Sequence, residues 1–222
     1  MKKIIITLIV ILFSCLLLVM PFLIKVNIDC RSQYGTCPKE VTDKINLFNG
    51  KSLFTARNSV SKILKSDFLV SGFSLQFRIP NILQTEVLVK KPVIAFKDNG
   101  SDYMILVDTE GKVLSEASDS ALPTITGITS LSGVGQKVSD KDIFALNLAN
   151  GVYQMYQVRD FTVQDDSLLV ELPGQIRVIF PLDWDSQILL GSLRLIYSKI
   201  QNEGNPEKYS QIDLRFKNPV LR

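Results

Sequence analysis

Ser59 and Lys62 match the S-x-x-K motif, in which a lysine activates a serine nucleophile in penicillin-binding enzymes. Those enzymes also need S-D-N-like and K-T-G-like elements, and the sequence contains neither. The two residues fall on the exposed side of an expected helix, where both side chains are simply solvated. A chance match is the better interpretation, and a serine–lysine acyl-enzyme stands only as an alternative.

The chain of 222 residues contains no histidine. This removes Ser-His-Asp and Cys-His catalysis, histidine-ligated zinc and the usual general base near neutral pH. Carboxylate pairs remain at Asp165-Asp166 and at Asp183 and Asp185, and such pairs can bind Mg²⁺ or share acid–base roles. One pair falls in an expected turn and the other at an expected helix start, both ordinary places for aspartate. The missing histidine disfavours an enzyme without excluding one, and we predict no cofactor and no metal.

The charges are nearly balanced, with 25 Lys and Arg against 22 Asp and Glu and a formal net charge of +3. A nucleic-acid-binding protein needs a clustered basic face, which this composition does not indicate. No phosphate-binding loop of the G-x-x-x-x-G-K-[ST] type is present. We predict no nucleic-acid partner and no small-molecule substrate.

The first residues form an apolar run from Ile4 to Ile24 without a charge. As a helix with a rise of ~1.5 Å per residue, this run would match the hydrocarbon core of a bilayer. No small-residue cleavage site ends it, which favours an uncleaved anchor over a signal peptide. Lys2 and Lys3 favour a cytoplasmic N-terminus. We expect a single-pass cell-membrane protein with a cytoplasmic stub at 1–3, a transmembrane helix at 4–24 and extracytoplasmic domains beyond it.

Two cysteines, Cys30 and Cys37, lie just after this run on either side of Tyr34-Gly35. Outside the cytoplasm, such a pair is typical of a disulfide that closes a short loop, and two free thiols are the alternative. Two cysteines without histidine make a poor metal site.

Residues 25–92 have the pattern of a strand–helix–helix–strand–strand module. Val26–Asp29 alternates as a short strand, and a helix is expected over 38–48. A second helix begins near Thr55, a good N-cap residue. Two long alternating strands follow, with a turn at Pro80-Asn81 between them. Pro92 marks the boundary of the module, because proline interrupts a strand ladder.

Residues 93–222 are predicted to form a mostly antiparallel β domain with one or two helices. One helix is expected over 140–150, followed by a strand over 156–163. Another helix begins at Asp185 or Ser186 and carries an apolar stripe. The segment 115–139 is rich in Ser, Thr and Gly and is expected to be irregular. The fold class predicted for the whole chain is therefore α+β, with the transmembrane helix in front.

The last expected strand covers residues 210–216. Its apolar residues Ile212, Leu214 and Phe216 alternate with Asp213, Arg215 and Lys217, so that one face is apolar and the other charged. A final strand often lies at the edge of a sheet, where a strand of another protein can pair with it. Periodicity alone favours the simpler interpretation of a core strand with a charged outer face.

The order of these pieces resembles the FtsQ/DivIB family of bacterial cell-division proteins. The resemblance covers the whole chain and rests on Ile79-Pro80-x-x-Leu83, on Val87-x-Val89-x-x-Pro92-Val93-Ile94-Ala95, on Val107-Asp108-x-x-Gly111-x-Val113 and on Ile212–Phe216. It implies a POTRA domain at 25–92 and an FtsQ-type β domain at 93–222. The sequence departs from the family at Lys90-Lys91, where the family often has an acidic residue followed by a basic one.

The resemblance implies a non-enzymatic scaffold of the division septum. Its partners would be small bitopic proteins of the FtsB and FtsL type and the septal peptidoglycan synthase complex. A partner strand would add to the C-terminal edge, with Arg215 taking a partner carboxylate and Phe216 acting as an apolar anchor. The implied partner-binding residues are Ile212, Asp213, Leu214, Arg215, Phe216, Lys217 and Asn218. A POTRA-bearing secretion component that handles unfolded polypeptides is the second hypothesis.

Overall fold

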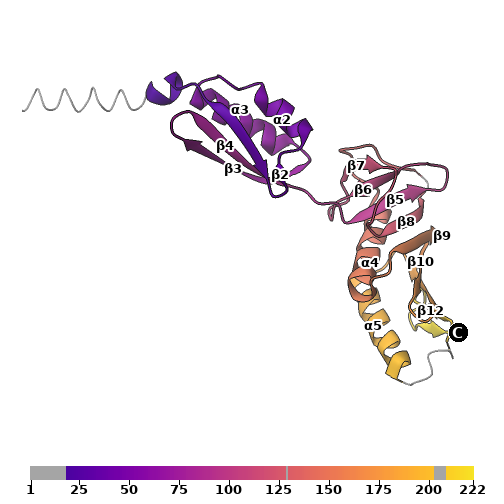
Figure 1. Ribbon diagram of the computed structural model, residues 1–222. Coiled ribbons are helices and arrows are strands. Elements are labelled where there is room, and N and C mark those ends of the chain that lie inside the picture. Colours follow the sequence, from indigo (N-terminus) through magenta and orange to yellow (C-terminus); the bar gives the residue numbers. More distant parts are fainter. Residues whose placement is uncertain (1–18, 129, 203–208) are drawn as a thin grey trace, which may run out of the picture. The chain divides into compact units, whose positions relative to one another are not determined.

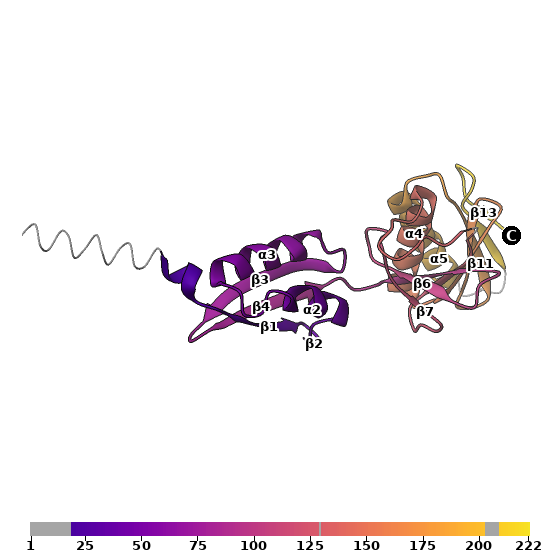
Figure 2. The same ribbon diagram turned by 90° about the horizontal axis from the view of Figure 1, so that it is seen from above.

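A computed structural model describes residues 19–128, 130–202 and 209–222. These residues form an α+β fold that divides into two compact units, with the division between Lys90 and Lys91. The boundary expected from the sequence falls at Pro92. Each unit has helices on one face of its own sheet (Figures 1 and 2) and its own hydrophobic core.

The predicted transmembrane helix at 4–24 lies mostly outside the described residues, which include only 19–24 of it. Within the described part of the chain, no helix is long and apolar enough to cross a membrane. The longest helices there, α4 (Asp140–Tyr156) and α5 (Ser186–Asn202), have 17 residues each, and a span needs about 20 apolar residues. The described residues therefore do not support the predicted transmembrane helix or the predicted single-pass membrane localisation.

The first unit contains a four-stranded sheet in the order β2-β1-β4-β3. Its elements along the chain are β1 (Asn27–Ser32), β2 (Gly35–Thr36), α2 (Lys39–Asn46), α3 (Leu53–Ser66), β3 (Val70–Arg78) and β4 (Ile82–Val89). The first strand pairs in parallel with β4, whereas β3 and β4 form an antiparallel hairpin. The short β2 was not predicted, and the other elements follow the expected order.

Both helices of this unit bury one face against the sheet. Val41 and Ile45 of α2 and Val60 and Leu64 of α3 are buried and share a core with Val87 of β4. The N-cap of α3 is Ser52 rather than Thr55, because the Ser52 hydroxyl accepts a hydrogen bond from the Thr55 amide at 3.3 Å.

The second unit contains a nine-stranded sheet in the order β13-β12-β11-β10-β9-β8-β5-β6-β7. The strands are β5 (Ile94–Asp98), β6 (Met104–Val107), β7 (Val113–Ala117), β8 (Thr124–Ile128), β9 (Asp160–Gln164), β10 (Ser167–Leu172), β11 (Ile176–Pro181), β12 (Gln211–Asp213) and β13 (Val220–Leu221). Three neighbouring pairs are parallel, namely β5–β8, β8–β9 and β11–β12, and the others are antiparallel. The segment expected to be irregular therefore contains β8, which joins the two halves of this sheet.

The first helix of the second unit, α4, is longer than the sequence predicts, and the strand expected from residue 156 begins only at Asp160. Gly151, the residue directly after the expected helix, lies inside α4. A Cβ atom on Gly151 would come within 2.4 Å of the Leu190 side chain, so the glycine permits α4 and α5 to pack closely. Tertiary contact thus outweighs the local strand preference of the residues after Gly151.

The start of α5 agrees with the sequence. The Asp185 carboxylate accepts hydrogen bonds from the amides of Gln187 and Ile188 at 2.8 and 3.3 Å. Leu189, Leu193 and Ile200 of the predicted stripe are buried against the sheet.

Candidate partner-binding edges

The C-terminal edge of the nine-stranded sheet differs from the single strand expected over 210–216. Only Gln211–Asp213 form β12, and the chain then turns back so that β13 pairs antiparallel with it. The amides of Ser210 and Gln211 donate to the Arg222 carbonyl at 2.7 and 3.0 Å, and the Arg222 amide donates to the Gln211 carbonyl at 3.0 Å. The chain's own last residues therefore occupy the side of β12 that was expected to be free.

The charged face expected on this strand is also different. Asp213 was assigned to an outer face, but its side chain is completely buried. The Nε and Nη2 atoms of Arg215 donate to Oδ1 and Oδ2 of Asp213 at 3.0 and 2.7 Å, and the Arg215 backbone amide donates to Oδ1 at 3.1 Å. These bonds from Arg215 hold the pKa of the Asp213 carboxyl below its ordinary value.

This closure explains why the strand is short. A carboxylate that accepts a bond from the backbone amide two residues later curls the chain into a turn. The curl begins after Leu214, whose side chain is buried and whose amide still donates to the Ile179 carbonyl at 2.9 Å. Arg215 is therefore a structural residue here as well as an implied partner contact.

The remaining residues of the predicted partner site lie on the surface. Phe216 is 50% exposed, and Lys217 and Asn218 are exposed in the turn between β12 and β13. Ile212 is fully buried in the core of the sheet. The structure thus brings one exposed aromatic side chain and a cation to the rim of this edge, beside backbone that already pairs with β13.

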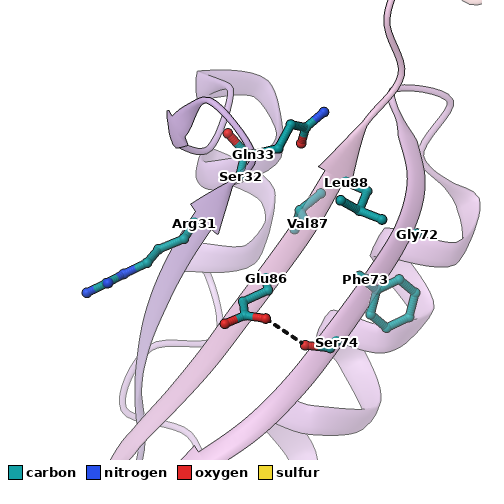
Figure 3. Close-up of a pocket in the computed structure, with 9 residues that line it drawn as sticks. All are labelled: Arg31, Ser32, Gln33, Gly72, Phe73, Ser74, Glu86, Val87 and Leu88. Carbon is teal, nitrogen blue, oxygen red and sulfur yellow. Dashed lines mark hydrogen bonds between the residues drawn. The ribbon is translucent and has the colours of Figure 1, made fainter.

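The first unit has a second candidate surface, an open groove of about 700 Å³ across β1, β4 and β3. It lies on the outer face of the sheet, and the residues that shape it are Arg31, Gln33, Gly72, Ser74, Glu86 and Leu88 (Figure 3). The Gln33 amide closes one end, because its nitrogen donates to the Val89 carbonyl at 2.6 Å and its oxygen accepts from the Val89 amide at 2.9 Å. The sequence patterns considered above gave no signal for this groove.

The cysteines of the first unit form a disulfide between Cys30 in β1 and Cys37 just before α2. Their Cα atoms are 5.7 Å apart. The bond joins the β1–β2 hairpin to the start of α2. Of the two alternatives that the sequence left open, the structure has the disulfide.

Of the candidate catalytic and metal residues, Asp165, Asp166 and Asp183 line one open pocket of the second unit, together with Arg215. Ser59 and Lys62 both lie on α3, with Lys62 exposed. Asp165 and Asp166 form the turn between β9 and β10, both with positive φ. Within the described residues, no group of three or more His, Cys, Asp or Glu side chains could hold a metal ion.

No protein-family model matches the chain, and no curated protein matches it. The resemblance to the FtsQ/DivIB family therefore rests on the sequence patterns alone and stays a prediction.

Proposed function

We propose that this chain is a non-enzymatic scaffold of bacterial cell division, of the FtsQ/DivIB type, that binds other division proteins through the C-terminal edge of its nine-stranded sheet. The observation that carries the proposal is the order of the two units. A module with two helices over a small mixed sheet precedes a larger sheet whose last strands lie at its C-terminal edge. Strand addition needs only backbone groups and a few anchoring side chains, so it requires no catalytic residues.

A partner strand that adds to the C-terminal edge must displace β13. It has only two residues, and short edge strands protect a sheet from unwanted pairing. A partner strand of the FtsB type would take the place of β13 on β12 and would pack an apolar group against Phe216. The exposed Lys217 would supply positive charge for a partner carboxylate. Arg215 would act mainly by keeping Asp213 paired and the turn in place.

Co-purification of the full chain with the FtsB-like protein of the same genome tests this proposal. We expect Phe216→Ala to weaken the complex by at least about fivefold, as loss of an aromatic anchor does. Phe54→Ala is the matched control, since Phe54 lies in the first unit and is 48% exposed. Failure to form the complex, or equal losses in the two variants, would contradict the proposal.

Depletion of the chain in its own cells separates this function from the secretion alternative. We expect filamentous cells without septa. Normal septa together with accumulation of unexported precursors would instead support a component that handles unfolded polypeptides.

A further inference from the structure

We propose that the β3 edge of the first unit is a second docking site, which takes an extended strand of another protein with a basic and an aliphatic side chain at alternate positions. This inference concerns a different edge from the one used above and does not depend on the division role. It rests on the groove in Figure 3 and on the position of β3 in its sheet.

The backbone of β3 is available for such pairing. The strand has nine residues, ends the sheet order and pairs only with β4 among the described strands. A strand of this length at an edge can form main-chain hydrogen bonds with an added strand, and pockets for alternate side chains then provide specificity.

The outward side chains of β3 beside the groove are small. Gly72 lies opposite Leu88 and Ser74 lies opposite Glu86 in the β3–β4 register. Neighbouring strands are only about 4.8 Å apart, so a long side chain on an added strand can reach over a glycine or a serine to the next strand. The small residues therefore make Glu86 and Leu88 accessible from the edge.

Both of these β4 side chains lean toward that edge. The Glu86 carboxylate accepts a hydrogen bond from the Ser74 hydroxyl at 3.3 Å, as Figure 3 shows, and another from the Gln84 amide at 2.9 Å. Both donors are neutral, so these bonds leave the negative charge in place for a cation of a partner. Leu88 is 56% exposed and lies over Gly72, where an added Cβ would be 3.6 Å from its Cδ1 atom.

The spacing of the two groups sets the partner's pattern. Glu86 and Leu88 are two residues apart on one face of β4, and residues two apart on an added strand also share a face. A lysine or arginine at one position and a leucine, isoleucine or valine two positions away would meet Glu86 and Leu88 together. Arg31 also lines the groove, but it lies on β1, on the far side of β4 from this edge, and its Nε atom donates to the Asp29 carboxylate at 3.1 Å. Glu86 is therefore the groove charge nearest to an added strand, and charge complementarity favours a basic strand over an acidic one.

Fluorescence anisotropy with labelled eight-residue peptides tests the proposal on the full chain. One peptide alternates threonine with lysine and leucine in turn, and the other has glutamate in place of each lysine. We expect the lysine peptide to bind at least about fivefold tighter, and Glu86→Lys to reverse this preference. A reversed preference is a gain of binding, which an unfolded variant cannot give.

Two matched controls locate the effect. Glu40→Lys makes the same charge change on α2 and should leave the preference for the lysine peptide intact. Leu88→Ser should weaken binding of the lysine peptide about fivefold, whereas Leu47→Ser, at another exposed leucine, should not change it. The proposal is overturned by any of three results: no binding of either peptide to the wild-type chain, the same preference in Glu86→Lys, or an equal effect of Glu40→Lys.

Discussion

The two sheets of this molecule end in different ways. In the first unit, the edge strand β3 is long, its outward residues beside the groove are small, and its outer side is open. In the second unit, the C-terminal edge is covered by the chain's own two-residue β13, and the strand beneath it is curled away by the Asp213–Arg215 contact.

The difference shows two solutions to one physical problem. An unpaired edge invites pairing with other chains, so proteins shorten it, twist it or cover it. Here the covered edge is available only to a strand that competes with β13, whereas the open edge selects by charge and side-chain size. We expect the covered edge to bind only partners of high affinity, because they must displace β13. We expect binding at the open edge to depend on the charge and size of the partner's side chains. The following changes test the comparison.

Substitution of a glycine by alanine should affect the free energy of unfolding differently in the two sheets. Gly127 in β8 has a φ of +84°, and a Cβ there would lie 2.3 Å from the Val163 carbonyl oxygen. We expect Gly127→Ala to lower the free energy of unfolding of the second unit by about 3 kcal/mol. Gly72→Ala at the open edge should be neutral or slightly stabilising. Urea unfolding monitored by the fluorescence of the single tryptophan, Trp184, reports the former, and circular dichroism reports the latter. Equal effects would mean that β8 is not constrained as described.

Two aspartate–arginine pairs allow the stability effect of a buried aspartate to be compared with that of an exposed one. Asp213 is buried, whereas Asp29 and Arg31 in β1 are both well exposed, with 3.1 Å between carboxylate and Nε. We expect Asp213→Ala to cost about 2 kcal/mol of unfolding free energy, because several charge-assisted hydrogen bonds are lost. Asp29→Ala should change it by less than about 0.5 kcal/mol. Denaturant titration of both variants makes the comparison, and similar losses would contradict the burial of Asp213.

Replacing a threonine by valine should have opposite effects on stability at two positions, buried Thr85 and half-buried Thr126. Among the described residues, Thr85 in β4 has a buried hydroxyl without a hydrogen-bond partner. Thr85→Val should stabilise the first unit by about 1 kcal/mol. Thr126 in β8 is the control, because its hydroxyl donates to the Phe161 carbonyl at 3.1 Å, and Thr126→Val should destabilise. Thermal unfolding followed by circular dichroism measures both shifts.

Asp213 should make the stability of the second unit depend on pH. The pKa of Asp213 is lowered in the folded protein by its bonds to Arg215. Its contribution to stability is therefore present above the ordinary aspartate pKa of about 3.9 and is lost as the pH falls through the lower folded value. Tryptophan-monitored unfolding between neutral pH and acid should show this loss, and Asp213→Ala should reduce it. An unchanged slope in that variant would assign the acid sensitivity to other groups.

The sequence predicted the first unit more fully than the second. Alternation in 73–79 and 83–89 and the apolar spacing of Val41 and Ile45 are local signals, and the observed β3, β4 and α2 follow them. The extra length of α4 was missed because Gly151 is explained only by its contact with Leu190 on another helix. The curl after Asp213 was missed because periodicity assigns alternate residues to opposite faces and cannot register a side chain that turns back on its own strand.

The candidate sites also differ in how far the sequence predicts them. The sequence identified Cys30 and Cys37 as a candidate disulfide across a short loop, with free thiols as the alternative, and the structure has the disulfide. The groove over Gly72 depends on the register of β3 against β4 and on two side chains that lean across a strand, and neither is visible in the order of residues.

The affinity of the chain for the FtsB-like protein, measured with and without Pro219–Arg222, tests the central claim most directly. Removing these residues frees β12 of its own competing strand and of the three backbone hydrogen bonds that hold Arg222. If the partner takes the place of β13, as proposed, the shortened chain should bind about fivefold tighter than the full chain. Unchanged or weaker binding would contradict strand addition on β12.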